Sequence, residues 1–168
     1  MKFLEPNARF NKITDITAEF LKEHEIKGLI LDVDNTLITL DKKPLEDIEK
    51  WIEDIKDAGF KICIASNSIH KERVETIAKK LDIPFVYFSV KPLRIGLSKA
   101  RKLLGLESKY IAEVGDQLFT DVIGANRMKM FTILTEPISP EKFKINHVKR
   151  KIEKKILRKK EEKKTKEK

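Results

Sequence analysis

Five short apolar segments, separated by amphipathic segments, constrain the fold of this chain more than any other feature of its sequence. Each is five or six residues long and mostly hydrophobic, which is typical of strands buried in a parallel sheet. They are residues 27–32, 60–65, 85–89, 110–114 and 130–134. Because such strands alternate with helices, we predict a Rossmann-like, three-layer α/β domain in which helices cover both faces of a five-stranded, mainly parallel sheet.

The segments between these strands carry hydrophobic side chains at helical spacing. In the clearest case Leu45, Ile48, Trp51, Ile52 and Ile55 share one face, so Trp51 is predicted to lie in the core. Further helices are predicted over residues 17–24, 74–81, 97–104 and 122–128.

Polar clusters follow four of the five predicted strands directly. They lie at residues 32–36, 66–68, 91 and 115–121. The carboxyl ends of parallel strands meet at one edge of the sheet, where ligands bind near a reversal of strand order. The sequence therefore predicts one site built from four distant segments.

Asp32 and Asp34 form the first of these clusters, at the end of a buried strand. Two carboxylates there suit metal-assisted phosphoryl transfer, in which one attacks phosphorus and the other donates and accepts protons. Mg²⁺ would offset the repulsion between carboxylate and phosphate. Read alone, the same residues would also suit an Asp/Asn turn that bonds its own backbone.

The later clusters supply the remaining groups that such a reaction needs. Asp116, with Asp32 and a backbone carbonyl, offers oxygen ligands to a hard cation. Lys91 offers a positive charge, and Ser66 a hydroxyl, to phosphoryl oxygens. Asp121 suits either a metal ligand or a cap of the following helix.

Further donors are expected from the backbone amides around Asn35 and Asn67. The side chain of Asn67 is itself expected to cap the next helix.

In order along the chain, the motifs Asp32-x-Asp34-x-Thr36, Ser66-Asn67, Lys91-Pro92 and Gly115-Asp116-x-x-x-x-Asp121 resemble the four motifs of the haloacid dehalogenase (HAD) superfamily. The details are similar to the YqeG branch of its type IIIA phosphatases, over roughly residues 1–140. The resemblance implies a Mg²⁺-dependent phosphoric monoester hydrolase that works through an aspartyl-phosphate.

The resemblance also implies a role for each matching residue. Asp32 would be the nucleophile and Asp34 the general acid and base, with its main-chain carbonyl on the metal. Ser66 would bind the phosphate, and Lys91 would stabilise the phospho-aspartate. Asp116 would be a metal ligand.

Asp121 would be a further metal ligand, directly or through water.

In the superfamily a cap domain usually follows the first or the second motif, but here 34 positions separate Asp32 from Ser66, and 25 separate Ser66 from Lys91. Each gap holds one helix and one strand, so we predict a capless and open site. Open sites in the superfamily serve bulky substrates, including lipid head groups, or sugars handled by oligomers.

The C-terminal segment differs from the rest in charge. Residues 142–168 hold 14 Lys and Arg against 4 Asp and Glu, and since the whole chain has a net charge of +9, the preceding part is nearly neutral. We therefore divide the chain into a phosphatase domain, residues 1–140, and a basic tail, residues 141–168. The almost wholly charged residues 159–168 are predicted to be disordered.

Apolar residues recur at helical spacing in the tail, at Ile145, Val148, Ile152 and Ile156. A basic amphipathic helix of this kind suits an anionic membrane surface, RNA phosphates or the chain's own domain, and the sequence favours none of them decisively.

No apolar run is long enough for a membrane span, and no signal-peptide core is found, so we expect a cytoplasmic protein, peripheral to the membrane if the tail binds lipid. The substrate of first choice is phosphatidylglycerophosphate or another lipid-anchored phosphate. The alternatives are a phosphatase of soluble sugar or nucleotide phosphates or of nucleic-acid ends, and an RNA- or ribosome-associated binding module that uses the tail. The oligomeric state is left open.

Overall fold

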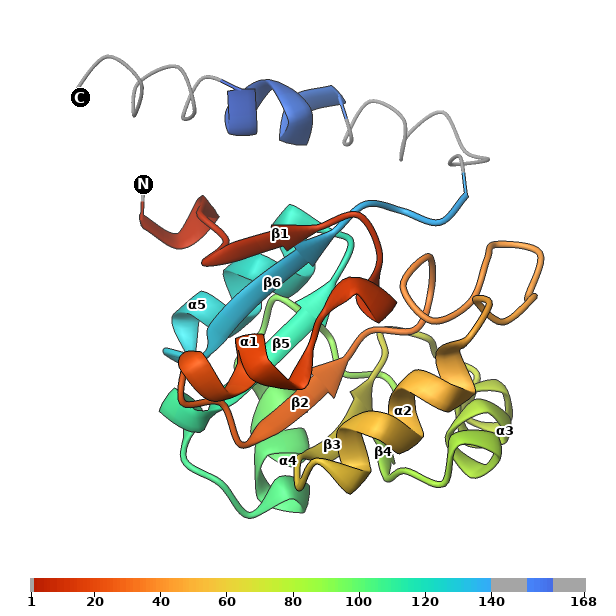
Figure 1. The fold of residues 1–168 in the computed structure, drawn as a ribbon. Coiled ribbons are helices and arrows are strands. Elements are labelled where there is room, and N and C mark those ends of the chain that lie inside the picture. Colours follow the sequence, from red (N-terminus) through yellow and green to blue (C-terminus); the bar gives the residue numbers. More distant parts are fainter. Residues whose placement is uncertain (1, 140–150, 159–168) are drawn as a thin grey trace. The chain divides into compact units, whose positions relative to one another are not determined.

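The structure is a computed structural model that describes residues 2–139 and 151–158 (Figure 1). The chain divides into two compact units, Met1–Ile138 and Ser139–Lys168. In chain order the elements of the first unit are η1 (Lys2–Leu4), β1 (Ala8–Phe10), η2 (Ile13–Asp15), α1 (Ala18–Glu23), β2 (Gly28–Leu31), α2 (Ile48–Asp57), β3 (Lys61–Ala65), α3 (Lys71–Leu81), β4 (Phe85–Val86), α4 (Arg94–Leu104), η3 (Ser108–Tyr110), β5 (Ile111–Gly115), η4 (Leu118–Val122), α5 (Ile123–Arg127) and β6 (Phe131–Thr135).

The sheet is parallel throughout, with the strand order β1-β6-β5-β2-β3-β4. The predicted α/β class is confirmed, but the predicted number of five strands was wrong, because β1 adds a sixth beside β6. β1 has only three residues and no clear hydrophobic pattern, so its sequence does not distinguish it from a loop. Tertiary contacts hold it in place: Thr132 donates to the side chain of Asn7, and the Asn7 amide donates to the carbonyl of Thr132.

The two faces of the sheet are covered by different helices (Figure 1). Alternate residues of the central strand β2 divide between two cores: Leu29 and Leu31 pack with residues of α1, α2 and α3, whereas Ile30 packs with residues of α4 and α5. This alternation follows from the two-residue period of a strand and gives the predicted three layers.

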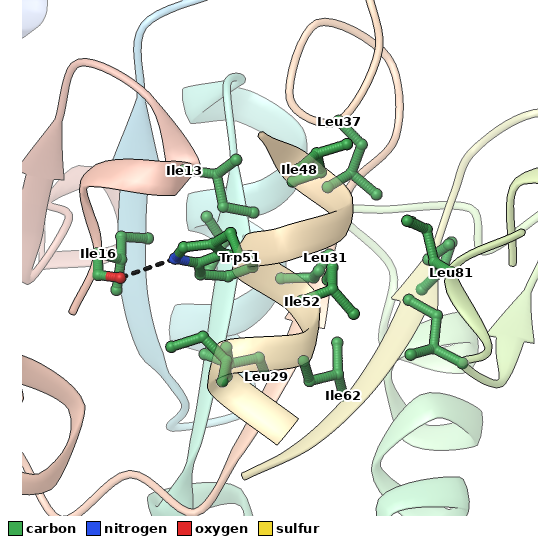
Figure 2. Close-up of a cluster of buried hydrophobic side chains, with 14 of the residues drawn as sticks. Ile13, Ile16, Leu29, Leu31, Leu37, Ile48, Trp51, Ile52, Ile62 and Leu81 are labelled. Atoms are coloured by element: carbon green, nitrogen blue, oxygen red, sulfur yellow. Dashed lines mark hydrogen bonds between the residues drawn. The ribbon is translucent and has the colours of Figure 1, made fainter. Parts of the chain in front are cut away.

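Trp51 lies in the larger core, as predicted (Figure 2). It shares the buried face of α2 with Ile48, Ile52 and Ile55. Its indole Nε1 donates to the carbonyl oxygen of Ile16 over 2.8 Å, so the one polar atom of this side chain is satisfied within the core.

α4 approaches the loop after β4 so closely that only glycine fits at position 96. A Cβ atom there would collide with the backbone of Ser89, and the Gly96 amide donates to the Ser89 carbonyl over 3.1 Å. Helix α4 thereby fixes the segment that carries Lys91.

No cap domain lies between β2 and α2, where residues 32–47 form a small flap. In this flap Thr39 donates to the carbonyl of Lys43, and Ile38 forms a β-bridge with Pro44. Only residues 66–70 separate β3 from α3, so the predicted absence of a cap is confirmed.

In the second unit, residues 151–158 are helical, which agrees with the predicted tail helix over that part of its length. Ile145, Val148 and residues 159–168 lie outside the described residues. Among the described helices, none has the length and apolar character needed to cross a membrane.

Candidate active site

The strand order reverses between β2 and β5, and the predicted site residues follow these two strands and the neighbouring strands β3 and β4. Leu31, the last residue of β2, pairs with Val114 on β5 and with Ile64 on β3. This register places Asp32, Asp116 and Ser66 at nearly the same level of the carboxyl edge. Such a reversal point is where open α/β sheets bind ligands.

Lys91 lies at the centre of the site, and its side chain is fully buried. Its ammonium Nζ is 3.0 Å from Asp32 Oδ1, 2.7 Å from Asp121 Oδ1 and 3.1 Å from Glu113 Oε1. The structure thus brings together residues that are distant in the chain, three of them predicted from the sequence.

Burial and charge act in opposite directions on these groups. Burial alone would lower the pKa of Lys91, but the carboxylates of Asp121, Asp32 and Glu113 more than reverse this effect, so its pKa lies above the ordinary value and the ammonium stays charged. Burial raises the pKa of Asp32 to about 7 and that of Glu113 to about 8, although Lys91 acts to lower both.

Asp32, Asp116 and Asp121 form an acidic cluster in which one carboxylate oxygen from each residue lies within 4.8 Å of the others. All three side chains are buried, and so is that of Glu113; the ammonium of Lys91 contacts Asp32, Asp121 and Glu113. Oxygen ligands at this spacing, with an excess of negative charge, fit a hard divalent cation. The cluster is therefore able to hold a metal ion.

Asp121 is fixed in the cluster by the turn that follows β5. Its Oδ2 accepts from the amide of Gln117 over 2.9 Å, and η4, a single π-helical turn, places its Oδ1 on Lys91. The carboxylate packs against the Cα of Gly115, where a Cβ atom would collide with it. Glycine is needed at position 115 because the strand and this carboxylate touch.

We expect Gly115→Ala to displace Asp121 and so to break its bonds to Lys91 and to the Gln117 amide. The free energy of unfolding should fall by about 1–3 kcal/mol, as in other overpacked sites. The increase in unfolding free energy that added Mg²⁺ produces should also be smaller in this variant. Denaturant unfolding with and without Mg²⁺ measures both effects, and an unchanged response to Mg²⁺ would contradict the prediction.

Ser66 and Asn67 organise the loop after β3. The Oγ of Ser66 accepts from the amide of Ser68 over 3.1 Å. The expectation that the side chain of Asn67 caps α3 was wrong, because this side chain holds the loop of Lys91 instead. Its Oδ1 accepts from the Lys91 amide and from the Ser89 hydroxyl, each over 2.7 Å, and its Nδ2 donates to the Lys91 carbonyl over 3.0 Å. Only its backbone amide is left for the predicted phosphate contact.

Asn35 lies in the turn that leads from the site into the flap. Its backbone is left-handed, with φ of 61°, and its amide donates to the carbonyl of Ile38 over 2.8 Å. The amide predicted to bind phosphate is thus used within the loop.

Asp34 is not among the clustered carboxylates. Its side chain forms an ion pair with Arg73 on the first turn of α3. The predicted metal contact of Asp34 concerns its main-chain carbonyl.

Two residues of this site were missed in the sequence. Glu113 had a signal, because an acid inside the apolar segment 110–114 must find a partner when it is buried. Arg73 had none, because an arginine on an amphipathic helix is an ordinary surface residue.

The raised pKa of Glu113 predicts how stability without metal depends on pH. Since the folded state keeps this proton up to about pH 8, while the unfolded chain loses it near 4.5, stability should fall as the pH rises through that window. One proton contributes a slope of at most about 1.4 kcal/mol per pH unit.

In EDTA, Glu113→Gln should therefore gain stability relative to the unchanged chain as the pH rises. Urea unfolding at several pH values measures this difference. A difference that stays constant with pH would show that Glu113 titrates normally.

Comparison with known proteins identifies relatives that are all described as phosphatases. A family model described as "Mitochondrial PGP phosphatase" matches residues 1–139. "Probable phosphatase YqeG" of Bacillus subtilis is 36% identical over 93% of this chain and 91% of its own length. "Phosphatidylglycerophosphate phosphatase 1, chloroplastic/mitochondrial" of Arabidopsis thaliana is 29% identical over 89% of this chain and 46% of its own length.

Among solved structures, the cobalt-bound deoxy-D-mannose-octulosonate 8-phosphate phosphatase of Haemophilus influenzae has the same fold. The superposition has a TM-score of 0.53 and covers 67% of this chain and 69% of the Haemophilus chain, and the two sequences are 18% identical.

The parallel sheet and the acidic site at its reversal point are those of a phosphatase of the HAD superfamily. The match over residues 1–139 and the 36% identity to the Bacillus protein make the assignment more specific. The chain belongs to the family of YqeG-like and PGP phosphatases.

Proposed function

We propose that this protein hydrolyses a lipid-anchored phosphomonoester, with phosphatidylglycerophosphate as the first candidate, through an aspartyl-phosphate on Asp32. The observation that carries the chemistry is the position of the Asp32 carboxylate. It lies at the reversal point of the sheet, bonded to Lys91 and clustered with Asp116 and Asp121.

In the first step a carboxylate oxygen of Asp32 attacks phosphorus, and the bond from phosphorus to the alcohol oxygen breaks. Asp34 donates a proton to the leaving oxygen. In the second step water attacks the phospho-aspartate, Asp34 takes a proton from it, and inorganic phosphate leaves as Asp32 is regenerated.

Lys91 orients Asp32 through Oδ1 and offsets the charge of the phosphoryl oxygens. Ser66 donates its hydroxyl to the phosphate. Asp32, Asp116 and Asp121, with the carbonyl of Asp34, would hold Mg²⁺, which neutralises phosphate charge and keeps the carboxylates ionised when it is bound.

The lipid character of the substrate is supported by the family model, by the named Arabidopsis relative and by exposed apolar side chains at the edge that holds the site. Ile69, in the loop after β3, is 67% exposed, and Phe88, in the loop after β4, is 57% exposed. These two loops are joined, because the Phe88 amide donates to the Ser68 carbonyl over 2.8 Å. Apolar side chains beside an open site suit contact with a lipid surface.

The test is phosphate release with Mg²⁺ from a substrate panel, with Asp32→Asn as the blank. The panel holds phosphatidylglycerophosphate in mixed micelles, sugar phosphates, nucleotides and phosphorylated oligonucleotides. A strong preference for the lipid that is lost in Asp32→Asn supports the proposal. Equal turnover of soluble esters would refute the lipid substrate, and no release from any member would favour an RNA-binding or ribosome-binding module.

The apolar loops give a second test. Phe88→Ser should lower kcat/KM on micelles by about 10-fold, in line with the burial energy of one large apolar side chain, and change turnover of soluble esters little. Leu103→Ser is the matched control, because Leu103 is 54% exposed at the far end of α4. Equal losses on micelles and soluble esters in Phe88→Ser would remove this support.

A further inference from the structure

The ion pair between Arg73 and Asp34 lies at the open edge of the site. Arg73 Nη1 donates to Asp34 Oδ2 over 3.4 Å, and Nη2 contacts Oδ1, so the guanidinium faces both oxygens of the carboxylate. The side chains are 28% and 36% exposed, in contrast with the fully buried Lys91. Unlike Lys91, this pair is therefore accessible from solvent.

In this ion pair Asp34 has no carboxylate oxygen left for a leaving group, and Arg73 has one donor without a hydrogen-bond partner among the described residues. A general acid must direct one oxygen to the leaving group, but Arg73 engages both oxygens of Asp34. Nε of Arg73 is buried and has no hydrogen-bond partner among the described residues. A buried donor without a partner is costly, so the observed pairing does not use the whole guanidinium.

When Asp34 turns to the leaving group, Arg73 needs another anion. From this we infer that Arg73 binds a second anionic group of the substrate, a phosphodiester carried by the leaving alcohol. A guanidinium presents parallel donors that match phosphate oxygens, which an ammonium does not. Because Arg73 contacts Asp34, and Asp34 donates to the leaving oxygen in the proposed reaction, the leaving alcohol would lie next to Arg73.

The inference rests on the proposed function and deepens it, because phosphatidylglycerophosphate carries a phosphodiester on the same glycerol that loses the terminal phosphate, and this diester stays on the leaving alcohol. Arg73 would then make the enzyme selective for this substrate over simple phosphomonoesters. Two soluble compounds isolate the effect from any lipid contact: glycerol 3-phosphate has no diester, and deacylated phosphatidylglycerophosphate has one.

The experiment compares kcat/KM for these two compounds in the unchanged chain, Arg73→Gln and Arg73→Lys. We expect the unchanged chain to prefer the diester-bearing compound, and Arg73→Gln to reduce that preference about 10- to 100-fold, mainly through KM, the range for lost bonds to a charged group. Arg73→Lys should restore only part of it. Lys71→Gln, which removes an exposed charge from the same turn of α3, should keep the preference.

Equal losses on both compounds in Arg73→Gln would overturn the inference, because a residue that only positions Asp34 affects both alike. No preference in the unchanged chain would overturn it too.

A binding measurement separates this inference from the proposed function. Calorimetry with glycerophosphoglycerol, which carries only the diester, needs no turnover. Binding that is lost in Arg73→Gln supports the inference even if neither compound is hydrolysed, and equal binding or none in both chains overturns it.

Discussion

Replacement of Lys91 by Met should lower the stability of this protein more than any other single substitution discussed above, and it should lower the activity as well. The side chain is fully buried, and its ammonium bonds Asp32, Glu113 and Asp121. Without it three carboxylates remain buried with no cation. Breaking a buried charge network in this way costs about 3–5 kcal/mol of unfolding free energy.

The activity of Lys91→Met should fall by about 10²–10³-fold, because the charge that stabilises the phosphoryl oxygens is lost. The stability loss should be larger at pH 8 than at pH 6, since Asp32 and Glu113, with pKa values of about 7 and 8, take up protons at the lower pH.

Lys99→Met is the matched control, because Lys99 is exposed on α4 and outside the site. Urea unfolding and phosphate release measure the two effects. If Lys91→Met were as stable and as active as Lys99→Met, the buried charge network would contribute neither to stability nor to activity.

Removal of divalent cations should abolish phosphate release, and added Mg²⁺ should restore it. Even with Glu113 protonated, as its raised pKa implies, the buried carboxylates of Asp32, Asp116 and Asp121 outnumber the ammonium of Lys91, and this excess of negative charge repels a phosphate group. Mg²⁺ at about 100 times its dissociation constant should also raise the unfolding free energy by about 2.7 kcal/mol.

Asp116→Asn should lose most of this stabilisation, whereas Asp57→Asn, which changes an exposed acid on α2, should keep it. Thermal unfolding across a Mg²⁺ titration measures the response. Phosphate release that survives EDTA would refute the metal assignment.

Much of this architecture follows from short-range patterns. The five predicted strands and the edge at which their polar clusters meet depend on hydrophobic period and strand direction, both of which are local properties of the sequence. β1 was missed because three residues carry too little pattern, and pairing with β6 and the bonds of Asn7 decide its structure.

The site was predictable wherever a residue type is unusual in its place, as with Asp32 after an apolar run. The same argument applies to Glu113, an acid inside an apolar run. The partners of Asp34 and Asn67 were not predictable, since they depend on which loops meet across the sheet edge.

The central position of β2 and β5 has a consequence for amide hydrogen exchange. Each has a paired strand on both sides, whereas β1 and β4 are short strands at the two edges of the sheet. Backbone amides of central strands exchange only in the global opening reaction, while edge strands open separately at lower free energy. The strands that lead directly into Asp32 and Asp116 should therefore be the last to become deuterated, and the acidic cluster should persist in molecules whose edges have already opened.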